Sequence, residues 1–411
     1  MIAHFFAPVA TVQRMRCGSL GPYLDRFADH LHQQGYSKQT GMEKIGLVAH
    51  LSRWLDRKKL KIEALDEQRV ADFLAARRKR FCRRFSDEPT LVQWLGYLRQ
   101  ANLIPTPLAT QESPRDRLEQ EYAQFLSQER GLGQATIHHY LRVDRNFLSG
   151  RFGSERVCLN QLRVPDVTGF ILQDSAALSL KAIHLRTTVL RSFLGFVHER
   201  GKLTANLAAA VPTVAHWRLS GVPSFLEPEQ VEELLKGCDQ DSEMDRRDYA
   251  ILLLLARLGL RAGEVARLSL DDFNWGAGEL RIRGKGAREH RLPLPWDVGQ
   301  ALARYIEKDR PACSARQVFI RIKAPHQSFS HSATISGIVR RALHRIELHP
   351  PHRGAHLLRH ALATQMLRKG GSLAQIGQIL GHQRAQTTEI YAKVDLTALR
   401  ALAQPWPGGV Q

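Results

Sequence analysis

Apolar residues recur every three or four positions through the first half of the chain. Leu118, Tyr122, Phe125 and Leu126 are one such series, and similar series precede and follow it. That spacing places the apolar side chains on one face of a helix. The pattern therefore predicts small helical bundles in this half of the chain.

Two segments of this helical half resemble each other. Gly35–Thr40 matches Gly131–Thr136 with a shift of 96 residues. The further matches, with shifts of 97 and 99, are Val70–Leu74 with Val167–Ile171 and Trp94–Leu98 with Phe193–Val197. Near-constant shifts favour an internal duplication. Chance similarity between two amphipathic helical segments stays open as the alternative, because helical periodicity alone can imitate a repeat.

Two proline-marked stretches divide the chain. They lie at Ile104–Pro107 and Val211–Ser224, where the apolar periodicity is interrupted. We therefore predict a helical domain at 1–110, a second helical domain at 113–215 and a third domain at 222–411. Exposed basic residues on the two helical domains favour contact with a polyanion over a merely solvated face.

The third domain has a different pattern. Proline and two acids at Glu227–Glu229 predict the start of a helix, and a second helix is expected at 245–258. Two alternating stretches, Glu279–Arg283 and His290–Leu294, flank a glycine-rich tip and predict a hairpin. Further helices are expected at 336–348, 356–369, 373–380 and 386–394. This domain should be α-helical with a small β-sheet.

Charge points to the class of partner. The chain has 59 Lys and Arg against 40 Asp and Glu, a formal charge of +19. A hydrophobic fraction of 43% and a charged fraction of 24% are values of a folded protein. The excess of positive charge favours nucleic acid. A solubility role and attraction to a membrane surface are the alternatives.

The cysteines and the apolar runs indicate a compartment. The five cysteines are scattered and form no Cys-x-x-Cys motif, so neither a disulfide framework nor a zinc site is predicted. The longest apolar block, 251–260, is interrupted by Arg257 and is too short to span a bilayer. The first twelve residues lack the basic start of a signal peptide. We therefore expect a cytoplasmic protein without a membrane partner.

Five short motifs in the third domain carry reactive side chains. In chain order they are Gly259-Leu260-Arg261, Gly284-Lys285-Gly286, His356-Leu357-Leu358-Arg359-His360, Gly381-His382 and Tyr391. Taken singly, each has an ordinary explanation, such as a capping arginine, a solvated hairpin lysine or a packed tyrosine. The two histidines four residues apart resemble half of a zinc site, but the glutamate and the third ligand of such a site are missing.

Taken together, the order Arg, Lys, His-x-x-Arg, Gly-His, Tyr resembles the tyrosine recombinase family, which includes the phage integrases and the Xer resolvases. The spacings also match, with 24 residues from Arg261 to Lys285 and nine from His382 to Tyr391. The resemblance covers about 226–403, and extends to about 115–214 as the family's helical, SAM-like core-binding domain. The first hundred residues depart from the minimal family plan, so an auxiliary DNA-binding role for them is a hypothesis.

The resemblance implies a fold and a set of catalytic residues. The fold would be mainly α-helical with a small sheet in the C-terminal catalytic domain, and helical N-terminal domains would form a clamp on DNA. Arg261 and Arg359 would hold the reacting phosphate, and Tyr391 would attack it. His356 would act as acid or base, and His382 would bind the phosphate or position the tyrosine.

The resemblance also implies the remainder of the reaction. Lys285 would protonate the departing 5′ oxygen, leaving a 3′-phosphotyrosyl link that a second strand can reverse without metal, ATP or any cofactor. Glu264 would support the turn at Arg261, and His360 would be structural. The partners would be double-stranded recombination sites, bound by four identical protomers or by a mixed tetramer with related recombinases.

Three other functions are alternatives to a recombinase. A type IB topoisomerase-like enzyme would share the chemistry but would not exchange strands between duplexes. A DNA-binding accessory protein would keep the fold without catalysis. A metal-dependent transposase is disfavoured, because the adjacent carboxylates of Asp271 and Asp272 should point in different directions.

Overall fold

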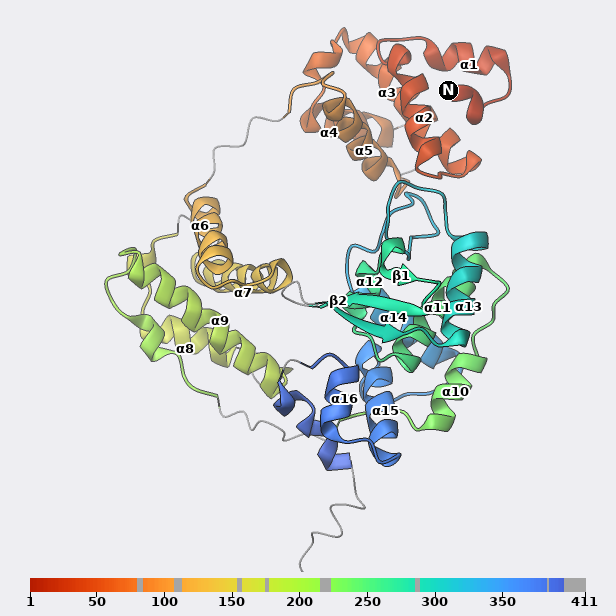
Figure 1. Ribbon diagram of the computed structural model, residues 1–411. Coiled ribbons are helices and arrows are strands. Elements are labelled where there is room, and N and C mark those ends of the chain that lie inside the picture. Colours follow the sequence, from red (N-terminus) through yellow and green to blue (C-terminus); the bar gives the residue numbers. More distant parts are fainter. Residues whose placement is uncertain are drawn as a thin grey trace, which may run out of the picture. The chain divides into compact units, whose positions relative to one another are not determined.

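The computed structural model describes residues 1–79, 84–106, 113–153, 157–173, 177–214, 223–284, 289–382 and 384–394. The chain divides into two compact units, one made of Met1–Pro105 with Gly221–Gln411 and the other of Thr106–Ser220. Figure 1 shows the elements of each. Among the described residues, no helix is both long enough and apolar enough to cross a membrane.

The N-terminal residues form a helical bundle. Its α-helices are α1 (Val9–Arg16), α2 (Gly21–Gln33), α3 (Lys38–Lys58), α4 (Glu67–Arg78) and α5 (Asp87–Gln100). Two of these helices begin at side-chain caps, because Ser37 accepts from the Thr40 N–H and Asp66 accepts from the Arg69 N–H. Phe27 and Trp94 pack edge-to-face in the core, with ring centroids 4.7 Å apart.

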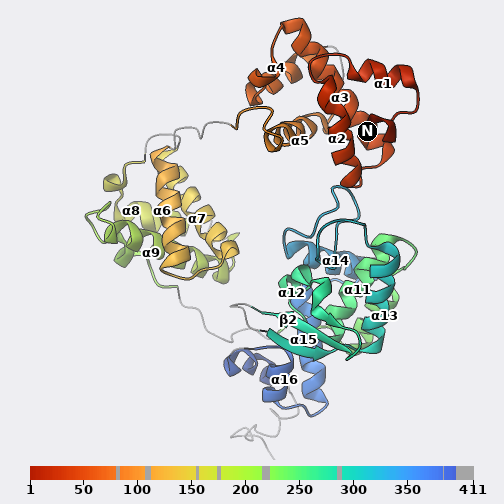
Figure 2. The same ribbon diagram turned by 45° about the horizontal axis from the view of Figure 1, so that its top comes forward.

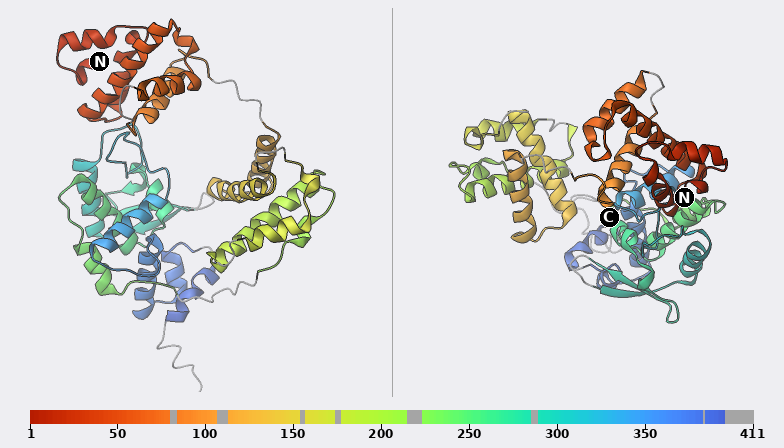
Figure 3. Two further views of the ribbon diagram at one scale, coloured as in Figure 1. Left: turned by 180° about the vertical axis from the view of Figure 1, so that it is seen from behind. Right: turned by 90° about the horizontal axis from the view of Figure 1, so that it is seen from above.

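The unit Thr106–Ser220 is a second bundle with a core of its own, seen from two further sides in Figure 3. Its helices are α6 (Pro114–Gln128), α7 (Gln134–Phe152), α8 (Val164–Leu172) and α9 (Leu180–Glu199). Tyr122 is completely buried between Phe125, Phe193 and Phe196, and its hydroxyl donates to Ser192 Oγ at 2.9 Å. The aromatic core thus fastens α6 to α9.

From α2 and α6 onward, the two bundles have the same order of α-helices at similar spacing. Helices α3 and α7 start 96 residues apart, and each follows a glycine with positive φ, Gly35 or Gly131. Helices α4 and α8 start 97 residues apart, each preceded by a 3-10 turn, η2 (Ile62–Ala64) or η3 (Leu159–Gln161). The shifts of 96 and 97 residues between these helices equal the shifts between the matching sequence segments that lie at or in them.

The C-terminal residues form a helical domain with a small antiparallel sheet, ordered β1 (Phe273–Asn274), β2 (Glu279–Arg283) and β3 (Glu289–Pro293). Its α-helices are α10 (Pro228–Lys236), α11 (Glu243–Arg257), α12 (Ala262–Arg267), α13 (Trp296–Arg304), α14 (Ala333–Arg345), α15 (Ala355–Arg368) and α16 (Leu373–Ile379). Helix α11 is buried along most of its length and packs on α13 and α15 (Figure 2). The predicted fold class, mainly helical with a small sheet, is confirmed.

Three details of the C-terminal domain differ from our expectation. Helix α13 and the short strand β1 were not predicted. The α-helix expected at 386–394 is instead two 3-10 turns, η8 (Ala385–Thr387) and η9 (Glu389–Val394). Branched side chains at Thr387, Thr388 and Ile390 disfavour a regular α-helix there, and the Tyr391 N–H bonds to the Thr388 carbonyl in the tighter i to i+3 pattern.

Candidate active site

A hollow of about 740 Å³ opens in the C-terminal domain. Its wall comes from the start of α12, the turn end of the β2–β3 hairpin, Ser332 before α14, the start of α15 and the segment after α16. Three of the residues predicted to react, Arg261, His356 and His382, line this hollow. The fold therefore brings together motifs that lie up to 121 positions apart in the sequence.

Arg261 is fixed at the wall by its neighbours. Its backbone N–H donates to Glu264 Oε2 at 2.8 Å and its guanidinium donates to Glu264 Oε1 at 2.7 Å, which is the support expected of Glu264. A third bond runs from Nη2 to the Gly381 carbonyl at 3.3 Å. Gly259, just before this turn, has φ +61, and a Cβ there would lie 2.7 Å from Leu380 Cδ2. Only glycine suits that position.

Arg359 lies behind the same wall and is only 4% exposed. Its guanidinium donates to the carbonyls of Gly259 at 2.5 Å and Leu380 at 2.6 Å. Burial, and then repulsion from Arg261, lower the pKa of Arg359 to about 10. Two guanidinium groups close enough to repel each other create a position where an anion is stabilised.

Tyr391 is buried in η9, with 1% of its surface exposed. Its hydroxyl lies 3.0 Å from His360 Nδ1, and its ring is parallel to that of His382, with centroids 6.4 Å apart. Burial raises the pKa of Tyr391, while the charges of Arg359 and Arg261 act in the opposite direction. The phenol is thus close to the predicted histidines and arginines, but it is not among the residues that line the hollow.

His360 has a closer relation to the phenol than we expected. Burial, followed by the nearby charges of His356 and Arg359, lowers the pKa of His360 to about 4, so its ring is neutral at pH 7. A neutral ring with its proton on Nε2 accepts the Tyr391 O–H at Nδ1. The sequence did indicate that His360 could belong to the site, because it lies four residues after His356 and therefore on the same face of α15.

Two histidines lie next to Gly381: His382 follows it in the chain, and His290 of β3 packs against it. His382 Nδ1 shares a 2.7 Å hydrogen bond with Thr388 Oγ1, and burial, then Arg359 and Arg261, lower the pKa of His382 to about 4. Gly381 has φ +59, and a Cβ there would lie 3.0 Å from His290 Cε1. His290 lines the hollow and was not predicted, although strand alternation places it on the same face as the buried Leu292.

Of the two remaining residues predicted to react, the structure describes His356 but not Lys285. His356 lines the hollow and its ring centroid lies 6.1 Å from that of His360. Lys285 lies outside the described residues, so its place is an expectation only; Gly284 before it does line the hollow.

Asp271 pairs with Arg316 and Asp272 lies 3.0 Å from Arg283, and both residues line a separate small hollow beside β1 and β2.

Comparison with known proteins identifies the family. Residues 224–397 match the model of the phage integrase family. The protein is also 42% identical, over 396 residues and 96% of either chain, to integrase/recombinase y4rA of Sinorhizobium fredii. The chain belongs to the phage integrase family. As a member of it, the chain is a tyrosine-type site-specific DNA recombinase.

Two further similarities agree with this family. The chain is 28% identical to the tyrosine recombinase XerD of Listeria monocytogenes over 289 residues, which is 68% of this chain and 95% of XerD. Its fold resembles that of the XerH site-specific recombinase bound to a palindromic difH substrate. The TM-score is 0.53 at 18% identity, and the match covers 76% of this chain and 94% of XerH. That likeness supports the integrase-family fold.

Proposed function

We propose that this recombinase cleaves and rejoins DNA through a 3′-phosphotyrosyl link to Tyr391, without metal, ATP or another cofactor. The observation that carries the proposal is that Arg261 and His382 line one hollow, while Arg359 and the phenol are buried next to them, the phenol beside the neutral imidazole of His360. Among the described residues, no group of three or more His, Cys, Asp or Glu side chains is arranged to hold a metal ion.

The two arginines would stabilise the charge that develops in the reaction. When the phosphorus is attacked, negative charge grows on its non-bridging oxygens. Arg261 is anchored by Glu264 and Arg359 by two carbonyl groups, so neither guanidinium has to be reoriented when that charge forms. Anchored donors of this kind stabilise a transition state more than a substrate, which is the requirement for catalysis.

The nucleophile would be activated by losing its proton to an imidazole. The phenol oxygen forms the new bond to phosphorus, the bond from phosphorus to the 5′ oxygen breaks, and the leaving oxygen takes up a proton. His360 contacts the phenol only in its buried position, whereas His356, which lines the hollow, would take the proton when the phenol attacks. We assign the proton for the 5′ oxygen to Lys285 and a phosphate contact to His382, following the family pattern.

Because Tyr391 is buried beside His360, the phenol must shift toward the hollow before it can attack. The segment that carries it consists of 3-10 turns, whose hydrogen bonds are weaker than those of an α-helix. We infer that DNA binding moves this segment. His360 would hold the hydroxyl until then.

The partners would be double-stranded recombination sites. We assign residues 113–215 to core-site binding and residues 222–411 to catalysis, and we expect four protomers on two duplexes, identical or mixed with related recombinases. A role in DNA integration or transposition by a mobile element, within the cytoplasm, is the biological setting we propose.

A covalent-trapping experiment tests the proposed chemistry. The DNA flanking the gene would be used to define a recombination site, and a duplex nicked beside the cleavage position would be offered to the protein. The wild type should form a denaturation-resistant DNA adduct, and the Tyr391→Phe variant should form none. An adduct in the phenylalanine variant would exclude Tyr391 as nucleophile, and no adduct with either protein would favour an accessory, non-catalytic role.

A further inference from the structure

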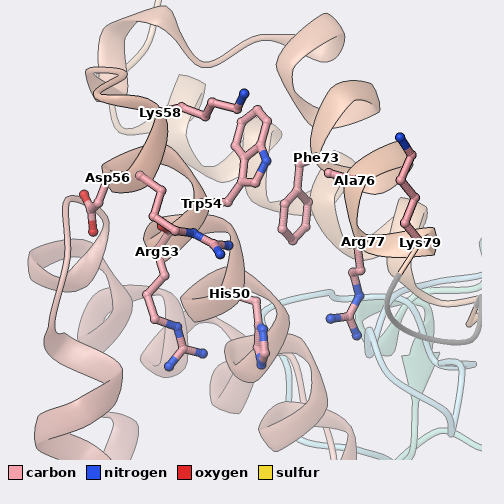
Figure 4. Close-up of a pocket in the computed structure, with 10 residues that line it drawn as sticks. His50, Arg53, Trp54, Asp56, Lys58, Phe73, Ala76, Arg77 and Lys79 are labelled. Carbon is pink, nitrogen blue, oxygen red and sulfur yellow. The ribbon is translucent and has the colours of Figure 1, made fainter.

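Cations line hollows in two parts of the described structure. One hollow lies in the N-terminal bundle between α3 and α4, where cations line it together with Trp54 and Phe73 (Figure 4). Its charge agrees with the auxiliary DNA-binding role expected for residues 1–110. The other is the hollow of the candidate active site, where His382 joins the cations. A neutral imidazole donates from only one of its two nitrogens, so the position of its proton decides whether His382 can bind an anion.

The ring of His382 is hydrogen-bonded to the hydroxyl of Thr388. His382 Nδ1 and Thr388 Oγ1 lie 2.7 Å apart. Burial, and then the charges of Arg359 and Arg261, lower the pKa of His382 to about 4, so the ring is neutral at pH 7. Its proton is therefore either on Nδ1, directed at Thr388, or on Nε2, the nitrogen left for the hollow that His382 lines.

The burial of Thr388 decides between these two arrangements. Thr388 is 2% exposed, and within the described part of the chain His382 Nδ1 is the acceptor that its hydroxyl meets. If Nδ1 carried the proton, the Thr388 O–H would be buried without an acceptor, at a cost of about 1–3 kcal/mol. If the hydroxyl donates to Nδ1, both groups are satisfied and Nε2 carries the ring proton.

The backbone around both side chains is fixed by hydrogen bonds of its own. The His382 N–H donates to the Gly377 carbonyl at 2.8 Å, and the Thr388 N–H donates to the Ala385 carbonyl at 2.8 Å. Gly377 also leaves room for the hydroxyl, because a Cβ on this residue would lie 3.0 Å from Thr388 Oγ1. The contact between the threonine and the histidine is therefore supported from both sides.

We propose that Thr388 is a positioning residue, whose hydroxyl keeps the His382 proton on Nε2 and directs that N–H at the reacting phosphate. The proposal rests on the proposed function, since the phosphate contact of His382 belongs to it. Thr388 itself does not touch the phosphate and acts through His382. A hydrogen bond to one nitrogen of a functional histidine fixes which nitrogen remains to act. Because Thr388 lies three residues before Tyr391, the segment that carries the phenol also orients the histidine.

The position of the proton can be measured by nitrogen NMR of the full chain with isotope-labelled histidine, in the absence of DNA. Protonated and unprotonated ring nitrogens differ in chemical shift, and the signals missing from a His382→Gln variant belong to His382. The wild type should show a protonated Nε2 and an unprotonated Nδ1. In Thr388→Val, which keeps the shape but has no O–H, the Nδ1 signal should move toward that of a protonated nitrogen. A wild-type proton on Nδ1, or an unchanged spectrum in Thr388→Val, would overturn the proposal.

Single-turnover cleavage of the nicked duplex measures the consequence for the reaction. Thr388→Val should cleave bound DNA about tenfold or more slowly, as expected for the loss of a hydrogen bond that orients a functional histidine, with DNA affinity unchanged. Thr388→Ser restores the hydroxyl and should recover most of the rate. The matched control is Thr364→Val, because Thr364 is 1% exposed and its hydroxyl has no partner among the described residues. The control should cleave like the wild type, and a Thr388→Val variant that does so too would contradict a positioning role.

A double-mutant cycle tests whether Thr388 acts through His382. If it does, Thr388→Val should slow the His382→Gln variant by less than about a further twofold, because the histidine that it positions is already gone. Losses that multiply would instead give Thr388 an independent role and refute the proposal. The NMR measurement needs neither DNA nor cleavage. Absence of the covalent adduct in the wild type would therefore refute the proposed chemistry, whereas the position of the His382 proton would still be judged by itself.

Discussion

Replacing Arg359 with methionine should separate catalysis from stability. The folded protein holds this cation at a cost, because burial and then repulsion from Arg261 lower its pKa by more than two units, to about 10. At about 1.4 kcal/mol per pKa unit, that is about 3 kcal/mol against the charged form. Methionine removes this cost and occupies a similar volume, but it leaves the carbonyls of Gly259 and Leu380 without their donor, at about 1–3 kcal/mol each.

These opposing effects are of similar size, so the free energy of unfolding of Arg359→Met should change by no more than about 2–3 kcal/mol. Cleavage should behave differently. Loss of one anchored donor to a developing oxyanion reduces rates by about 100-fold or more, equivalent to about 3 kcal/mol of transition-state stabilisation.

The assay is single-turnover cleavage of the nicked duplex, with urea unfolding and DNA binding measured on the same preparation. Arg316→Met serves as the control, because Arg316 is an exposed cation paired with Asp271 on another surface. The reasoning would fail if cleavage by Arg359→Met fell less than about tenfold while binding was retained. It would fail equally if cleavage and binding were lost together in a folded variant.

Three further predictions concern the histidines and one glycine. His360→Ala removes the partner of the Tyr391 hydroxyl, so nitration of Tyr391 in the DNA-free protein should become several-fold faster; an unchanged rate would deny His360 a holding role. His360 and His382 have folded pKa values of about 4 against 6.5, so the unfolded state binds more protons between these values. Unfolding free energy should therefore fall as pH drops from about 6.5 toward 4, and a double His→Gln variant measured by urea titration should show a flatter dependence. Gly381→Ala forces a side chain into φ +59 and toward His290, so it should destabilise by about 1 kcal/mol or more and slow cleavage, whereas Gly150→Ala, at an exposed position inside α7, should do neither.

Sequence patterns predicted the general architecture and several candidate residues that the fold places near one another. Helical periodicity predicted the bundles, and the alternation around residue 280 predicted the hairpin whose strands are β2 and β3. The order of the motifs selected Arg261, His356 and His382, which line one hollow, together with Arg359 and Tyr391 close behind them. Local patterns suffice for Arg261, His356 and Arg359 because these residues stand at the starts of the regular helices α12 and α15.

The contacts between motifs could not be predicted, because they depend on how distant segments pack. Nothing in the sequence near Arg359 indicates that its donors end on Gly259 and Leu380, and nothing near Tyr391 indicates His360 as its partner. The 3-10 turns of the tyrosine segment were likewise missed, since apolar spacing in a nine-residue stretch does not distinguish them from an α-helix. Tertiary packing determines both the hydrogen-bond partners of Arg359 and Tyr391 and the conformation of the segment that carries the tyrosine.

The concealed phenol has a consequence for the safety of the genome that this enzyme acts on. Tyr391, the proposed nucleophile, has 1% of its surface exposed and in that position could not attack the phosphodiesters that the protein meets during its search along a chromosome. Cleavage of a strand would then require both binding to the recombination site and the rearrangement that frees the hydroxyl. Fidelity would thus be built into the resting shape of the molecule, ahead of any chemistry.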